Sequence, residues 1–80
     1  MTSNEFIFGS RENANTFARS KRWRPTGRAA WLKPNGTCVH FLAFEEQLAA
    51  ISEGERIYVV GTLSATATRT LKKAGAVIVR

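Results

Sequence analysis

Six basic side chains without an acidic neighbour lie between residues 19 and 33 of the sequence. They are Arg19, Lys21, Arg22, Arg24, Arg28 and Lys33, and the segment also contains Trp23 and Trp31. Cationic side chains pair with the phosphates of a nucleic-acid backbone, and aromatic rings stack on unpaired bases. The segment therefore predicts a surface that binds nucleic acid or another polyanion, with Trp23 as a stacking or anchor residue. The alternative is a solvated helix end followed by a hairpin whose tryptophans belong to the core.

The distribution of charge along the chain favours the binding surface. The formal net charge is +6, and residues 19–33 alone carry a balance of +6. The flanking segments nearly cancel, with a balance of −1 over residues 1–18 and +1 over residues 34–80. Aspartate is absent from the sequence, which argues against sites built on Asp and against an acidic mimic of DNA.

Two strand-to-helix junctions form a second candidate site, in this case for an anion. Each junction has an apolar strand, then a glycine, then a hydroxyl residue, then a helical segment. The unpaired N–H groups at the start of a helix attract phosphate. Neither junction has the three spaced glycines of a dinucleotide site or the lysine of a P-loop, so the alternative is two ordinary tight turns. The residues are Gly9, Ser10 and Arg11 in the first junction and Gly61, Thr62 and Ser64 in the second.

Metal binding and catalysis find little support in the sequence. Cys38 and His40 are the only thiol and the only imidazole, whereas a zinc site needs three or four ligands. Glu45 and Glu46 are neighbours on a predicted helix and diverge by about 100°, which does not suit a pair of catalytic carboxylates. We therefore expect no metal, no cofactor and no enzymatic activity.

Alternating strand and helix patterns define the elements that must position these residues. The order predicts an α/β fold: a small single-domain sheet with parallel βαβ elements and one β-hairpin, about five strands and three helices. The predicted strands are Glu5–Phe8, Arg28–Lys33, Thr37–Ala43, Ile57–Val60 and Ala76–Val79, and the predicted helices are Arg11 to about Arg22, Phe44–Glu53 and Ala65–Ala74.

The hairpin has the clearest turn signal, because Pro34-Asn35-Gly36 supplies the torsions that a tight turn requires. This turn predicts a register with Trp31 opposite Val39. The continuous apolar run Ile57–Val60 is typical of a strand buried on both faces. If this strand lies beside Glu5–Phe8, the two junctions open on one edge of the sheet.

Capping residues set the predicted helix ends. Ser10 and Ser64 are good N-caps, and Gly54 and Gly75 are C-terminal stops. In the middle helix, Phe44, Leu48 and Ile51 are expected on one buried side.

The 80 residues are enough for one domain, residues 1–80, in which we expect residues 1–4 to be frayed. No stretch approaches the ~18 apolar residues of a membrane span, so no membrane partner is expected. The first residues lack the pattern of a secretory signal, and one cysteine cannot form an internal disulfide. These features favour the cytoplasm.

The sequence FIFGSRENANTFARSKRW, residues 6–23, together with ERIYVVGTLS, residues 55–64, resembles small Rossmann-like proteins of phages and other mobile elements. Such proteins are commonly accessory factors, and some small phage proteins are anti-CRISPR or other anti-defence inhibitors. The resemblance implies a non-enzymatic binding protein in a bacterial host cell. Its expected target is nucleic acid or a host nucleoprotein complex such as a CRISPR effector. The alternative is a small nucleotide- or phosphate-binding domain that uses the two junctions.

Overall fold

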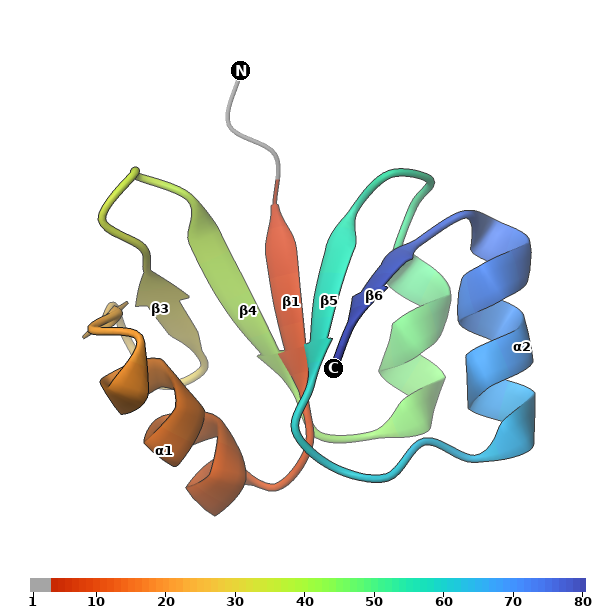
Figure 1. Cartoon of the computed structure of the whole chain (residues 1–80), viewed down its shortest axis with the longest axis horizontal. Helices are drawn as coiled ribbons and strands as arrows, with labels where there is room; N and C mark the ends of the chain where they lie inside the picture. The colour runs from red at the N-terminus through yellow and green to blue at the C-terminus, as the bar shows by residue number, and fades with distance from the viewer. Residues whose placement is uncertain (1–3) are drawn as a thin grey trace.

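The computed structural model describes residues 4–80 and places one six-stranded sheet between helices (Figure 1). The predicted α/β class is confirmed, with one strand more than expected and the three expected helices. The prediction of a frayed start lies, for residues 1–3, outside the described residues. The elements are β1 (Glu5–Phe8), α1 (Arg11–Ser20), β2 (Arg24–Pro25), β3 (Ala30–Leu32), β4 (Cys38–Leu42), the 3₁₀ helix η1 (Glu45–Ala50), β5 (Arg56–Val59), α2 (Ala65–Ala74) and β6 (Val77–Val79).

The strand order is β2-β3-β4-β1-β5-β6, so the first strand of the chain lies inside the sheet. β1 is parallel to both β4 and β5, and β5 is parallel to β6. β2, β3 and β4 form an antiparallel meander at the other side. The sheet is therefore mixed, with its parallel part covered by helices as parallel strands require.

The alternation of side chains along the strands divides the core into two layers. Ile7 and Tyr58 point to the face that α1 covers with Ala14 and Ala18. The next side chain of β1, Phe8, lies on the opposite face among residues of η1 and α2. Figure 1 shows the same division, with α1 on one side of the sheet and α2 on the other.

Two sequence predictions about strands are confirmed. The hairpin has the predicted register, with Trp31 opposite Val39, and its turn closes with a 2.9 Å hydrogen bond from the N–H of Gly36 to the carbonyl of Lys33. In β5, which lies between β1 and β6, Ile57 is buried in one layer and Tyr58 in the other.

The predicted caps Ser10, Ser64 and Gly75 are confirmed, whereas Gly54 does not end a helix, because η1 stops at Ala50. α2 has its predicted bounds, because Ser64 accepts a hydrogen bond from the N–H of Ala67 and Gly75 adopts the left-handed conformation, with φ of 78°. α1 ends at Ser20, earlier than predicted, because Arg22 has φ of 61° and the N–H of Trp23 turns back to the carbonyl of Ala18. This reversal places Trp23 in the core layer between α1 and the sheet.

The prediction of a helix over Phe44–Glu53 is wrong in length and type. Only Glu45–Ala50 is helical, as a 3₁₀ helix, and Phe44 is its extended N-cap with a side chain 66% exposed. Leu48 and Ile51 do reach the core, at the three-residue spacing that suits 3₁₀ geometry. The side chain of Gln47 accepts hydrogen bonds from the N–H groups of Ala43 and Phe44, which fixes the start of this short helix.

The sequence does not predict β2, a strand of two residues, Arg24–Pro25. Pro25 lacks an N–H group, but the strand forms the edge of the sheet, where a missing donor is tolerated. Among residues 4–80, no helix has both the length and the apolar character needed to cross a bilayer.

Candidate functional site

Two adjoining hollows lie between α1 and the strands β2 and β3. The larger has a volume of about 360 Å³ and the smaller about 120 Å³. Both are lined by Asn15, Pro25 and Trp31, so they form one continuous depression that we call the arginine groove. Arg11, Gly27, Arg28 and Ala30 complete the larger hollow, and Arg19 and Trp23 complete the smaller.

One wall of the groove is a stripe along α1. Arg11, Asn15 and Arg19 follow each other at four-residue spacing, which places their side chains on one side of a helix. Ala14 and Ala18, one position earlier in two of these turns, are buried against the sheet. The small size of these alanines lets α1 lie close to the sheet, so the longer side chains next to them border the groove.

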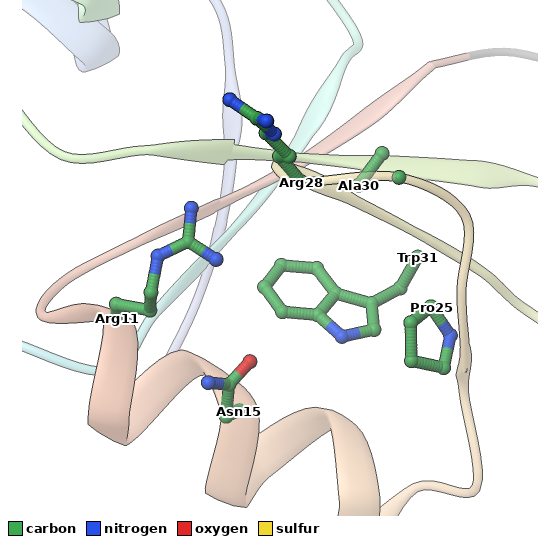
Figure 2. Close-up of a pocket in the computed structure, with 7 residues that line it drawn as sticks. Arg11, Asn15, Pro25, Arg28, Ala30 and Trp31 are labelled. Atoms are coloured by element: carbon green, nitrogen blue, oxygen red, sulfur yellow. The ribbon is translucent and has the colours of Figure 1, made fainter.

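The opposite wall is the β2–β3 segment. Pro25 pairs with Trp31 across the two strands, and the N–H of Thr26 donates a 3.0 Å hydrogen bond to the carbonyl of Ala30. This closed loop carries the exposed Arg28. Figure 2 shows the indole of Trp31 across the centre of the larger hollow, with Arg11 and Asn15 on the α1 side and Pro25 on the other.

Both tryptophans of the basic segment are core residues. Trp31 is 5% exposed and Trp23 is 8% exposed. Trp23 packs edge-on against Phe17 and Tyr58, with ring centroids 5.4 and 5.1 Å away. The ring of Trp23 is therefore covered by the protein, which disfavours its expected role as a stacking residue. Both tryptophans contribute to the floor of the groove.

The arginines of the groove carry charge that the described chain does not neutralise. Within residues 4–80, the one ion pair is between Lys33 and Glu5, and no acidic side chain of this range lines either hollow. Arg11 lies over the ring of Phe41, with its guanidinium carbon 5.2 Å from the ring centroid, which orients the side chain without removing its charge.

Lys33 is separated from the other cations of its segment. Its ammonium group donates to a carboxylate oxygen of Glu5 at 2.9 Å and to the hydroxyl of Tyr58 at 3.2 Å, and that hydroxyl donates to the same Glu5 oxygen at 2.9 Å. We call these three residues the buried cluster. Burial by itself lowers the pKa of Lys33, but the hydrogen bonds to Glu5 and Tyr58 outweigh it and leave the pKa raised.

The other predicted contact residues, Lys21, Arg22 and Arg24, are exposed and lie outside the lining of both hollows. Lys21 lies near the ring of Phe17, with its nitrogen 5.5 Å from the ring centroid. These cations extend the positive surface beyond the groove, because Lys21 and Arg22 directly follow the end of α1 and Arg24 is the first residue of β2.

The two glycine junctions meet at one edge of the sheet, as expected from neighbouring strands. They meet very closely: a Cβ atom on Gly9 would lie 2.7 Å from Cγ2 of Val60, and one on Gly61 would lie 3.1 Å from Cα of Gly9. A side chain at Gly9 would clash with Val60, and one at Gly61 would crowd the backbone of Gly9, so the close approach of the two junctions favours glycine at both positions. This observation explains both glycines without a ligand.

At both junctions, the polar groups at the start of the helix form hydrogen bonds with side chains of the protein itself. Ser10 accepts a 3.1 Å hydrogen bond from the N–H of Asn13. At α2, both the N–H and the hydroxyl of Ser64 donate to the carboxylate of Glu45, at 3.1 and 2.8 Å. Glu45 supplies there the negative charge that a phosphate would bring. Thr62 is exposed in the loop before this cap, and Arg11 belongs to the groove.

Cys38 and His40 lie in β4 with the spacing of residues on one face, and His40 packs near Phe6 with ring centroids 5.6 Å apart. In the part of the chain that the structure describes, no group of three or more His, Cys, Asp or Glu side chains could hold a metal ion.

The structure thus combines residues from both sequence predictions. Arg11 came from the first junction and Arg19 and Arg28 from the basic segment, and they now border one groove with Asn15, which the sequence did not single out. The four-residue spacing of Arg11, Asn15 and Arg19 was the signal that could have revealed it.

Comparison with family models, with curated proteins and with solved structures finds no match to this chain. The resemblance to small phage proteins therefore stays a prediction.

Proposed function

We propose that this protein binds nucleic acid through the arginine groove and the cations around it, without catalysing a reaction. The observation that carries the proposal is the convergence of Arg11, Arg19 and Arg28 on one groove that no acidic side chain of residues 4–80 lines. Guanidinium groups suit phosphate oxygens, because their planar fork can donate two parallel hydrogen bonds.

The character of the groove floor favours contact with the backbone over stacking on bases. Both tryptophan rings are almost fully covered, so the donors available to a ligand are the arginines and the amide of Asn15. Phosphate contacts of this kind give affinity with little sequence preference. Phosphates held in a host nucleoprotein complex, including a CRISPR effector, offer the same chemistry and are included in the proposal.

A salt titration tests this function. Binding of labelled single strands and duplexes is measured by fluorescence anisotropy, starting at low salt. At physiological salt we expect dissociation constants of roughly 1 to 100 μM, and weaker binding as salt rises. No binding to either substrate at low salt would overturn the proposal for free nucleic acid.

A matched pair of variants locates the surface. The triple change Arg11→Gln, Arg19→Gln and Arg28→Gln removes three charges from the groove. The control changes Arg69, Lys72 and Lys73 of α2 to Gln, which removes three charges from the helix on the other face of the sheet. The quantity compared is the steepness with which the logarithm of the binding constant falls with the logarithm of salt concentration. We expect the first variant to lower this steepness by about 2, at about 0.7 for each single-strand phosphate contact, and the second to leave it near the wild-type value.

A further inference from the structure

The two hollows of the arginine groove differ in charge. The larger is lined by two arginines, Arg11 and Arg28, and the smaller by one, Arg19. No acidic side chain of the described residues lines either of them. A ligand that fills both hollows would therefore meet about twice as much positive charge at one end as at the other.

The larger hollow has room for more than one phosphate group. Its volume of about 360 Å³ lies within the ~300–1,000 Å³ range of small-molecule sites. Its two arginines come from different walls, α1 and the β2–β3 loop, so they can contact a bound anion from two directions. Pro25, Ala30 and the indole of Trp31 give it an apolar side next to these charges (Figure 2).

Nucleic acids offer two kinds of phosphate. An internal phosphodiester carries one negative charge, whereas a phosphomonoester carries about −1.5 to −2 at pH 7 and has three strong acceptor oxygens. Two guanidinium groups match the monoester in charge and in number of donors, and one matches the diester. A phosphomonoester occurs in a strand at a phosphorylated end.

We propose that the groove holds the phosphorylated end of a nucleic-acid strand, with the terminal phosphate between Arg11 and Arg28 and a following phosphodiester beside Arg19. The nucleotides between them would pass over Asn15, Pro25 and Trp31, which both hollows share. Arg11 and Arg19 are separated by about 12 Å along the helix axis, so the strand lies along α1. This inference rests on the proposed function and names its preferred ligand.

The test compares one short single strand in three forms: with a 5′-phosphate, with a 3′-phosphate, and with hydroxyl groups at both ends. Their affinities are measured by competition against one labelled strand at constant salt. We expect at least one phosphorylated form to bind about tenfold more tightly than the hydroxyl form, as one added charge-assisted contact gives. The 5′ and 3′ arms show which end enters the groove.

The variant Arg28→Gln tests the position of the terminal phosphate. Arg28 is exposed on a loop, so the change should leave the fold intact. We expect it to reduce the preference for the phosphorylated end from about tenfold to about twofold or less. The matched control is Arg24→Gln, an exposed arginine of the same segment outside the groove lining, which should weaken all three strands equally and keep the preference.

The outcomes separate this inference from the function on which it rests. Equal binding of all three strands, with the expected salt dependence, would overturn end recognition and leave nucleic-acid binding in place. A phosphoserine peptide that competes as well as the phosphorylated strand would also overturn it, in favour of a phosphorylated protein. Absence of binding to any strand at low salt would overturn the proposed function itself.

Discussion

The buried cluster and the arginine groove lie on the same face of the sheet and both draw on residues 19–33, but their charges meet different surroundings. In the cluster, the side chain of Lys33 is 15% exposed and that of Glu5 is 11% exposed, and the charge of each is matched by the other. In the groove, Arg19 and Arg28 are exposed and no described carboxylate lines the site with them.

The difference shows that a run of cations in a sequence is not yet a binding surface. Lys33 follows Trp31 by two positions, so the alternation of the strand turns its side chain toward the covered face, where Glu5 and Tyr58 lie. Arg28 lies in the loop before β3, where no strand geometry directs it inward. The position of each residue relative to the sheet decides whether its charge serves stability or binding.

Removal of the charge in the buried cluster should have the largest effect on folding. We expect Lys33→Met to lower the free energy of unfolding by about 2 to 3 kcal/mol, because it removes the ammonium group that is hydrogen-bonded to the buried Glu5 carboxylate. Urea denaturation followed by the fluorescence of the two buried tryptophans measures this change.

Two controls accompany that variant. Lys21→Met removes an exposed cation of the same segment and should change stability by less than about 0.5 kcal/mol. The double variant Glu5→Gln with Lys33→Met should be more stable than the sum of the single effects implies. Equal effects of Lys33→Met and Lys21→Met on stability would contradict the distinction between the paired charge of the buried cluster and the exposed cations.

Alkaline pH should have a smaller effect on the same cluster. The pKa of Lys33 is raised in the folded protein, so its stabilising contribution is complete below the ordinary lysine pKa of about 10.4 and is lost as pH rises through the folded value. We expect the stability advantage of the wild type over Lys33→Met to shrink by about 1 kcal/mol or less above pH 10.4, because the cluster touches solvent. An advantage that stays constant from pH 8 to pH 11 would contradict the assignment.

The arginine groove should contribute least to stability. We expect the triple groove variant to stay within about 0.5 kcal/mol of the wild type in the free energy of unfolding, since none of its three arginines forms an ion pair within residues 4–80. The same denaturation experiment checks it. A loss as large as that of Lys33→Met would mean that these arginines serve the fold, and a lower affinity for nucleic acid would then have a structural cause.

The parts of the fold that could be predicted are those with local signals. The hairpin register followed from Pro34-Asn35-Gly36, and the bounds of α2 followed from Ser64 and Gly75, because turns and caps act through residues a few positions apart. The apolar pattern predicts a longer α-helix in place of η1, since the hydrogen bonds that Gln47 makes to the backbone before it leave no mark in that pattern.

The candidate site depended on contacts that the sequence does not reveal. Glu5 and Tyr58 are 53 residues apart, so the burial of Lys33 between them could not be inferred from its neighbours. The groove required β2, an edge strand made of Arg24 and Pro25 whose pairing with β3 depends on the fold of the whole sheet. The sequence did identify Arg11, Arg19 and Arg28, but it assigned them to two separate sites.

The central place of β1 also has a consequence for how the chain folds. Its two partners are distant in the sequence, since β4 lies in the middle of the chain and β5 in the second half, and within residues 4–80 no segment next to β1 pairs with it. During synthesis, β1 can pair with its neighbours only after β4 and then β5 have been made. Because such distant pairings slow folding, we expect β1 to pair with β4 and β5 later than the local β3–β4 hairpin forms.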